Sequence, residues 1–157
     1  MTAAHTTADV ATPALTDLLA RYARAVAGKD LAAFCALYAE DVVVFDPFDS
    51  WTLSGLANWR AATAAWFAAV GDAPMTVTHR QVQAHGQGDV LAGHAWAAYT
   101  SPAHCGAMPV SVDNRCTLIA RRHATGWRIV HEHHSLPLRL ATLQPLFGPA
   151  PPQEGPT

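Results

Sequence analysis

The chain is poor in charge, and its few basic residues do not cluster. Only 14% of the 157 residues are charged, and the net charge is −2 with histidine neutral. Arg21, Arg24 and Lys29 are the only lysine or arginine residues among the first 50. Because a nucleic-acid-binding surface needs a basic patch or stripe, we expect no nucleic-acid partner.

Long apolar runs, leader features and paired cysteines are also missing. No apolar stretch approaches the roughly 20 residues that cross a bilayer, and the N-terminus lacks the positive region and apolar block of a signal peptide. Cys35, Cys105 and Cys116 are widely spaced without a CxxC pair, which is typical of reduced thiols. We therefore expect a cytoplasmic protein with no membrane partner.

Hydrophobic residues, in contrast, make up 50% of the sequence. At this length the composition fits a single domain with a substantial core. Residues 1–12 are small and polar, which predicts a flexible arm, and the proline-rich residues 141–157 predict a flexible tail. The folded domain is expected at 13–140.

The hydrophobic period changes from helical to strand-like after residue 72. We expect helices near 13–27, 31–38 and 55–70, short strands at 42–45 and 51–53, and long strands at 75–85, 90–100, 108–122 and 127–135. Thr12 and Asp30 are candidate N-caps of the first two helices. Helices followed by an antiparallel meander predict an α+β fold, with a cone-shaped curved antiparallel sheet packed on three N-terminal helices. The inside of such a cone is a natural small-molecule site.

A tyrosine and an aspartate are the first candidate chemical groups. Tyr22 shares the apolar face of the first helix, and Asp46 ends an apolar strand just before Pro47, which cannot continue a central strand. A phenol donor and a carboxylate in one apolar cavity can move a proton next to a carbonyl. The alternatives are that Tyr22 is an ordinary core residue and that Asp46 is a turn residue bonded to local backbone.

The segment His131-Glu132-His133-His134-Ser135 is the second conspicuous feature. Alternation along a strand puts the residues 131, 133 and 135 on one sheet face and the residues 132 and 134 on the other. With Thr125-Gly126 as a two-residue turn, His133 opposes Leu118. Residues 131, 133 and 135 then face inward. A bulge that shifts the register by one would instead set Glu132 or His134 against Leu118.

In the favoured register, the inner face joins two strands into one binding surface. Its expected residues are Asn114, Cys116, Leu118, His131, His133 and Ser135. His131 and His133 would serve as a catalytic acid or a polar contact. A metal held by these two histidines and Asp46 is the alternative; we expect no metal, since histidine pairs are usually hydrogen-bonded. Phe45, Trp51 and Trp66 are expected to shape the apolar part of the pocket.

Several short motifs resemble the ketosteroid isomerases: R-Y at 21–22, G-K-D-L at 28–31, A-L-Y-A-E-D-V at 36–42 and D-P at 46–47. The remainder, including GWRIVHEHHSLP at 126–137, is more similar to SnoaL-like polyketide cyclases and DUF4440-type proteins. These belong to the nuclear transport factor two-like superfamily, and the resemblance covers about 14–138. It implies that Tyr22 matches the oxyanion-hole tyrosine and Asp46 the general base. It also implies a homodimer that forms through the outer sheet face.

One position departs from the isomerase pattern. Leu118 stands where the resemblance places a second oxyanion donor, and loss of one such donor typically costs about 10²–10³ in rate. His133 is the expected substitute, and steroid isomerisation itself is not expected.

Our leading hypothesis is a small-molecule enzyme of cofactor-free proton-transfer type, such as an isomerase, cyclase or dehydratase. Asp46 would remove a proton alpha to a carbonyl, and Tyr22, helped by His133 or His131, would stabilise the enolate oxygen. The alternatives are a noncatalytic small-ligand-binding or association module, because a fold does not fix a function, and a hydrolase in which Asp46 and a histidine activate water.

Overall fold

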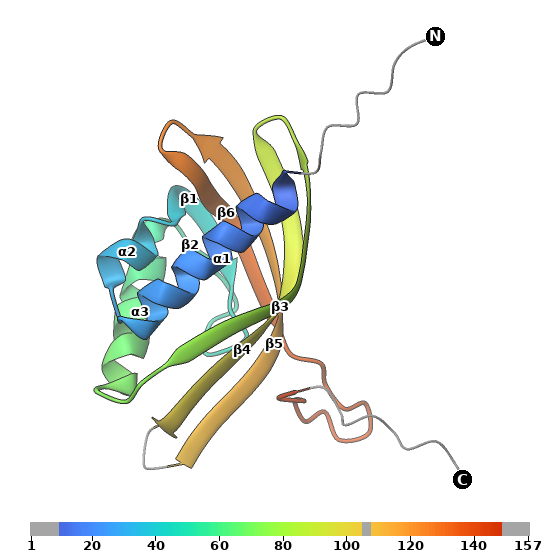
Figure 1. The fold of residues 1–157 in the computed structure, drawn as a ribbon. Coiled ribbons are helices and arrows are strands. Elements are labelled where there is room, and N and C mark those ends of the chain that lie inside the picture. Colours follow the sequence, from blue (N-terminus) through green and yellow to red (C-terminus); the bar gives the residue numbers. More distant parts are fainter. Residues whose placement is uncertain (1–9, 105–107, 149–157) are drawn as a thin grey trace.

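The computed structural model describes residues 10–104 and 108–148, which form three helices and six strands (Figure 1). The helices are α1 (Ala11–Ala27), α2 (Leu31–Cys35) and α3 (Leu56–Val70). The strands are β1 (Tyr38–Phe45), β2 (Leu53–Ser54), β3 (Thr76–Gln87), β4 (Val90–His104), β5 (Met108–His123) and β6 (Gly126–Ser135). Cys105 lies outside the described residues. None of the helices that the structure describes is long and apolar enough to cross a membrane.

The strands form one curved sheet in the order β2-β1-β6-β5-β4-β3. Strands β3 to β6 make the predicted antiparallel meander, and β2 pairs antiparallel with β1. The α+β class and the open, curved sheet are therefore confirmed. The expectation of a wholly antiparallel sheet is wrong at one place, because β1 runs parallel to β6. The first and last strands of the domain thus lie side by side.

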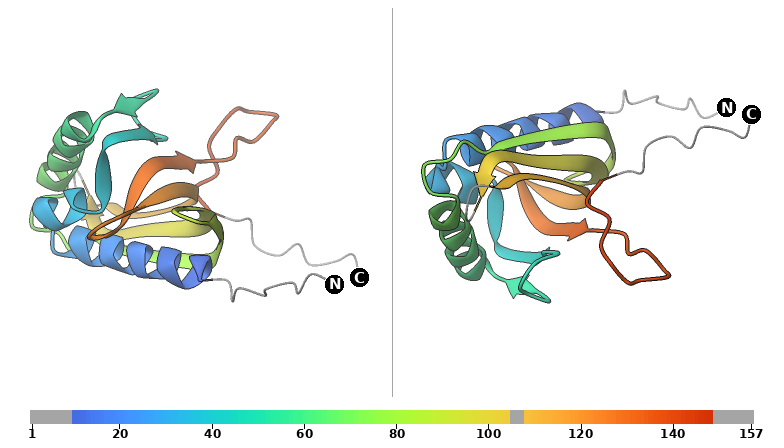
Figure 2. Two further views of the ribbon diagram at one scale, coloured as in Figure 1. Left: turned by 90° about the horizontal axis from the view of Figure 1, so that it is seen from above. Right: turned by 90° about the horizontal axis from the view of Figure 1, so that it is seen from below.

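The helices cover the concave side of the sheet (Figure 2). Helix α1 packs mainly on β3 and β4, and α3 packs on β1 and β2. The apolar face of α1 is buried as predicted; its buried residues include Leu15, Leu18, Leu19, Tyr22 and Val26. Because α1 lies across the inside of the sheet, the Tyr22 ring points into the centre of the domain.

The two predicted N-caps differ in outcome. Asp30 caps α2 through a bond from the Ala33 amide to Asp30 Oδ1 at 2.9 Å, as predicted. Thr12 does not cap α1, which begins before it at Ala11. Its hydroxyl instead donates to the Ala84 carbonyl at 3.2 Å and accepts from the Ala84 amide at 3.0 Å. Thr12 therefore fastens the start of α1 to β3.

Gly93 allows α1 to approach the sheet closely. It lies in β4 opposite Ala84, and a Cβ atom at this position would meet the Leu15 side chain and would lie 2.7 Å from Ala84 Cβ. We expect Gly93→Ala to lower the free energy of unfolding by about 1–3 kcal/mol, as other overpacked cores do. Denaturant unfolding measures the change.

Gly28→Ala is the matched control for this substitution. Its new Cβ would have only an ordinary contact with the Arg24 carbonyl at 3.5 Å, and the Gly28 backbone is helical. We expect its stability to stay within about 0.5 kcal/mol of the wild type. Equal losses in the two variants would contradict the close approach at Gly93.

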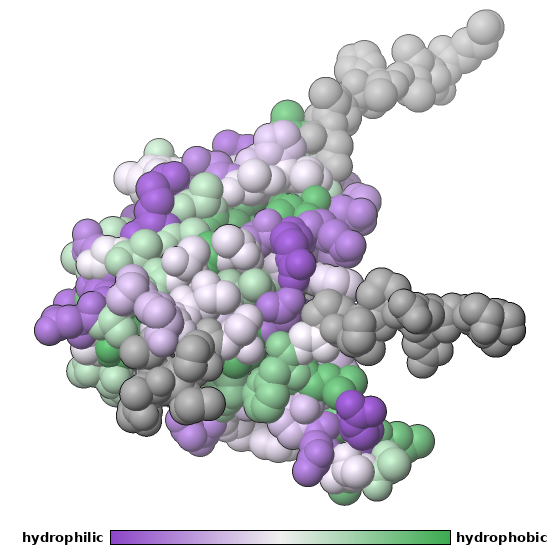
Figure 3. Space-filling view, turned by 60° about the horizontal axis from the view of Figure 1, so that its bottom comes forward, coloured by the Kyte–Doolittle hydropathy of each residue, from purple (hydrophilic) through white to green (hydrophobic). Residues whose placement is uncertain are grey.

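Residues that follow β6 fold back along the sheet. The Asp113 amide donates to the Phe147 carbonyl at 2.8 Å, and the Leu146 amide donates to the Pro137 carbonyl at 2.8 Å. This loop leaves Leu140 92% exposed. Figure 3 shows hydrophobic and hydrophilic residues interspersed on one face of the molecule. Of the predicted flexible arm and tail, residues 1–9 and 149–157 lie outside the described residues.

Candidate functional site

A β-bulge in β6 decides which residues of the histidine-rich segment face the core. Ala120 pairs with Ile129, but Ile119 pairs with His131, so Val130 is an extra residue on β6. A bulge of this kind shifts the side chains that follow it to the other face of the sheet.

Glu132 and His134 consequently face the interior. Their exposed fractions are only 1% and 5%, and they lie opposite Leu118 and Cys116 on β5. The predicted inner placement of Asn114, Cys116 and Leu118 is confirmed by their burial. Their role in ligand binding stays a prediction.

The prediction that His131, His133 and Ser135 face inward is wrong. The turn residues are Ala124-Thr125, because His123 pairs with Gly126, and this shift of two residues keeps the expected face; the bulge then shifts the pairing by one and reverses the face. His131 Nδ1 lies 2.8 Å from the Val43 carbonyl on the neighbouring strand, and His133 is exposed. These residues therefore cannot complete the interior site in the way that the favoured register implied.

The interior carboxylate and imidazole belong to a hydrogen-bonded network. Tyr38 Oη donates to Glu132 Oε2 at 2.7 Å. His134 Nε2 lies 2.6 Å from Glu132 Oε1, and His134 Nδ1 lies 2.9 Å from Asn114 Oδ1. Both partners of the ring are acceptor oxygens, so both ring nitrogens carry hydrogen. His134 is thus an imidazolium paired with the Glu132 carboxylate.

The surroundings of His134 support the charged form. Burial by itself lowers the pKa of His134, but its hydrogen-bonded partners, above all the Glu132 carboxylate, outweigh burial and raise the pKa well above the ordinary 6.5. A charge pair that is buried in this way is costly unless its partners satisfy it fully. Such an arrangement is common at functional sites.

Two tyrosine hydroxyls form a second polar pair beside the network. Tyr22 Oη and Tyr99 Oη lie 2.8 Å apart, and the Tyr99 ring centre is 6.1 Å from that of His134. Burial raises the pKa of both phenols, so both stay protonated. One hydroxyl hydrogen forms the bond between them, and the other is left to donate to a third group.

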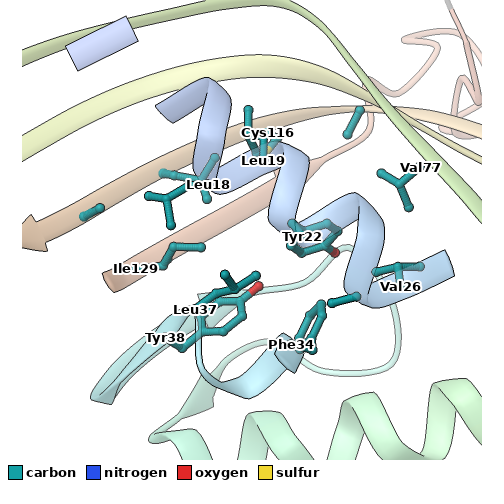
Figure 4. Packing of buried hydrophobic residues seen from close by; sticks show 14 of the residues in the cluster. Leu18, Leu19, Tyr22, Val26, Phe34, Leu37, Tyr38, Val77, Cys116 and Ile129 are labelled. Atoms are coloured by element: carbon teal, nitrogen blue, oxygen red, sulfur yellow. The ribbon is translucent and has the colours of Figure 1, made fainter. Parts of the chain in front are cut away.

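The Phe34 ring packs against the rings of Tyr22 and Tyr38. Figure 4 shows Tyr22 on α1 and Phe34 on α2 close to Tyr38 at the start of β1. The Phe34 ring centre lies 5.0 Å from that of Tyr22 and 5.2 Å from that of Tyr38. Close packing of this kind restricts the rings and fixes the direction of their hydroxyls.

Asp46 follows the end of β1, close to this network. It continues the inward-facing positions Val42 and Val44 of β1, and the register that pairs Phe45 with His133 sets Asp46 beside His134. Burial raises the Asp46 pKa from 3.8, and the Phe48 amide and His134 oppose the shift. The amide donates to Asp46 Oδ1 at 2.9 Å, which is the local turn bond that the simpler interpretation predicts.

An open pocket of about 700 Å³ lies at this end of the sheet. Residues 45–51 together with His133 and His134 line it. Asp46 and His134 therefore share one solvent-accessible wall, while the hydroxyl pair of Tyr22 and Tyr99 lies deeper. His134 thus lies near both predicted groups, since it lines the pocket with Asp46 and its ring packs against Tyr99, which is bonded to Tyr22.

The three predicted aromatic pocket residues occupy different places. Phe45 and Trp51 line the pocket, and Trp51 is 96% exposed. Trp66 is half-buried and lies beside Tyr99, with ring centres 6.0 Å apart. Their contribution to binding stays a prediction.

Sequence reasoning missed three polar residues of the interior: Tyr38, His79 and Tyr99. The alternative register with a bulge, which sets Glu132 against Leu118, is confirmed. The expected second helix includes Tyr38, but the helix ends earlier, at Cys35. A two-residue alternation from Val77, which is buried, marks His79 as inward-facing. No comparable signal in the sequence indicated the extra residue at Val130.

The alternative metal site is not assembled. Among the residues that the structure describes, no three histidine, cysteine, aspartate or glutamate side chains are grouped to hold a metal ion. His131 and His133 contact the Phe45 ring, with ring centres 4.9 and 5.6 Å apart. They lie on the outer face, away from the inward-facing Glu132 and His134.

Comparison with known sequences and structures adds a family assignment to this geometry. The sequence model described as the SnoaL-like domain matches residues 15–139. No curated protein sequence matches the chain significantly.

Several solved structures share the fold over most of the chain. An NTF2-like protein of unknown function from Pseudomonas putida KT2440 is 25% identical, with a TM-score of 0.78 over 90% of this chain and 97% of the other. A Streptomyces avermitilis protein described as a "putative dehydratase" of the NTF2-like family is 16% identical, with a TM-score of 0.73 over 83% and 99%. A Novosphingobium aromaticivorans protein described as a "putative aromatic ring hydroxylase" is 22% identical, with a TM-score of 0.70 over 87% and 93%.

Proposed function

Because the chain belongs to the SnoaL-like domain family, we propose that it is a small-molecule enzyme of cofactor-free proton-transfer type, acting at a carbon next to a carbonyl. The observation that carries the proposal is the half-buried Asp46 carboxylate beside the buried His134–Glu132 pair. A carboxylate in this setting is a better base than a solvated one, because burial raises its pKa.

The proposed step divides two tasks between the base and the network. Asp46 takes the proton from the alpha carbon, and the electron pair of the broken C–H bond forms the C=C bond of an enolate. The new negative charge on oxygen is stabilised by the spare hydroxyl hydrogen of Tyr22 and Tyr99 and by the fixed positive charge of His134. Return of the proton from Asp46 to another carbon gives an isomerase, and its transfer to a beta-hydroxyl group, which then leaves as water, gives a dehydratase.

In this proposal His134 acts by its charge rather than by giving up a proton. Both of its N–H groups are already bonded, to Glu132 and to Asn114. Preoriented charges in a site with little water stabilise a transition state without reorganisation. The network therefore supplies the electrostatic part of the second donor that Leu118 cannot provide.

Noncatalytic binding of a small ligand is the second candidate. The observation that favours it is the hydrogen bond from the Phe48 amide to Asp46 Oδ1, which a simple turn residue would also make. Under this alternative, the pocket holds a ligand without changing it.

Exchange of alpha protons for deuterium separates the two candidates. Wild-type protein is incubated in D₂O with cyclohexanone, 2-tetralone and 2-decalone, and proton NMR follows the alpha signals. Enzymatic proton transfer predicts exchange well above that in buffer containing equal concentrations of acetate and imidazole. A ketone that binds, as judged by shifted protein resonances, yet exchanges at the buffer rate would support the binding module.

A further inference from the structure

His79 is an interior imidazole that the proposed step does not use. It lies on the inner face of β3, is half-buried and pairs with Ala97 on β4. Ala97 in turn pairs with Asn114 on β5. Neighbouring strands lie about 4.8 Å apart, so His79 and Asn114 are separated by roughly two strand spacings. The only side chain of this row between them is the methyl group of Ala97.

No hydrogen-bond partner of the His79 ring is found among the residues that the structure describes. Its one close ring neighbour is Tyr22, in an edge-to-face contact with ring centres 5.8 Å apart. The ring nitrogens of His79 are not fully enclosed, because the side chain is only half-buried and they are not among the buried unpartnered atoms. A bound molecule can therefore reach a ring nitrogen that no described protein group occupies.

The groups around His79 keep its ring neutral. Burial and the positive charge of His134 lower the His79 pKa to about 4, although the Glu132 charge opposes them. The Tyr22 and Tyr99 phenols on α1 and β4 are uncharged, because burial raises their pKa values. A neutral imidazole always presents one nitrogen with a free lone pair.

We propose that His79 is a further ligand-binding residue, whose free ring nitrogen accepts a hydrogen bond from a hydroxyl group of the bound molecule. The site then selects a hydroxylated ring compound, with its hydroxyl at His79 and its carbonyl toward the hydroxyl pair and His134. This inference deepens the proposed function, because it gives the interior site a substrate class. A molecule with a carbonyl alone would leave the His79 acceptor unpartnered.

The test uses two probes of nearly equal shape, 2-naphthol and 2-methoxynaphthalene. The ether carries a methyl group in place of the hydroxyl hydrogen and so cannot donate, and the change of the affinity ratio on removal of the acceptor measures the donated bond. We expect the wild type to bind the naphthol about tenfold more tightly, since one hydrogen bond is typically worth that factor. Fluorescence titration of each probe gives the ratio.

Three variants locate the acceptor. His79→Phe should bring the ratio close to one, and His79→Gln, which keeps an acceptor oxygen, should retain part of it. His85→Phe is the matched control, because His85 is an exposed histidine of the same strand, and its ratio should equal that of the wild type. An unchanged ratio in His79→Phe, or equal affinities in the wild type, would overturn the proposal.

A measurement on the wild type covers the case in which His79→Phe does not fold. The His79 ring resonance should shift on addition of 2-naphthol and stay in place with 2-methoxynaphthalene; movement with neither probe would count against the proposal. The hydroxyl preference and the alpha-proton exchange are measured independently, so each proposal can fail without the other. A hydroxyl preference without alpha-proton exchange would leave His79 as a binding residue of a noncatalytic pocket, and exchange without the preference would reject His79 alone.

Discussion

Asp46→Asn is expected to slow alpha-proton exchange by about 10²–10⁴-fold, the usual contribution of a general base. The amide keeps the shape of the carboxylate and can still accept the Phe48 hydrogen bond, so the fold and ketone binding should change little. Proton NMR in D₂O measures the exchange rate, and shifted protein resonances measure ketone binding. A loss confined to the rate would identify Asp46 as the proton acceptor.

Asp41→Asn is the matched control on the same strand. Asp41 is exposed and lies 3.8 Å from Arg121 in a surface ion pair, which contributes little to stability. Its exchange rate should match that of the wild type. Wild-type rates in both variants would remove Asp46 from the mechanism.

The pH dependence of the exchange rate is a second test of the Asp46 carboxylate. The base must be ionised to accept a proton, so the exchange rate should fall as the pH drops through the Asp46 pKa. Burial places that pKa above the ordinary 3.8. If the exchange rate falls with an apparent pKa at or below 3.8, a group other than Asp46 controls it.

Glu132→Ala is expected to cause the largest loss of stability, about 3–5 kcal/mol, as when one partner of a buried ion pair is removed. The substitution leaves the Tyr38 hydroxyl and His134 Nε2 without their acceptor. Small domains are stable by only about 5–15 kcal/mol, so a loss of this size removes a large share of the stability and increases the unfolded fraction at room temperature. Urea unfolding followed by circular dichroism measures the loss.

Glu40→Ala serves as the comparison for this variant. Glu40 is an exposed residue of β1, and its removal should change stability by no more than about 0.5 kcal/mol. Similar effects of the two substitutions would mean that the Glu132 network contributes nothing beyond an ordinary surface carboxylate.

The same pair makes stability depend on pH in a defined direction. The His134 pKa is raised in the folded protein above the ordinary 6.5. Its contribution to stability is therefore fully present below about pH 6.5 and is lost as the pH rises through the folded-state pKa. Glu132→Ala should weaken this alkaline loss, because the imidazolium no longer has its carboxylate.

The sequence predicted the elements well where a single periodic pattern dominated. The apolar face of α1, the Asp30 cap and the four long strands follow from local residue types, and the sequence placed Asp46 correctly at the end of β1. These features depend on neighbours within one turn or one strand. Local signals therefore located Tyr22 and Asp46 but did not show what lies between them.

The register of the last hairpin could not be derived in the same way. The turn at Ala124-Thr125 shifts the pairing by two residues and keeps the faces, but the extra residue Val130 exchanges the two faces of the segment after the bulge. Strand alternation is a period of two, so one inserted residue reverses every later assignment. The four polar residues at 131–134 fit either face equally well by residue type. Only the packing of β6 between β1 and β5 decides that Glu132 and His134 are inside.

The parallel contact of β1 with β6 also bears on how the protein folds. Tyr38 and Glu132, which are hydrogen-bonded, are 94 residues apart in the sequence. Contacts between such distant segments form slowly, because a long loop must close before they stabilise the chain. During synthesis, the site can assemble only after β6 has left the ribosome, so we expect the chemistry of the pocket to be among the last features that the folding chain acquires.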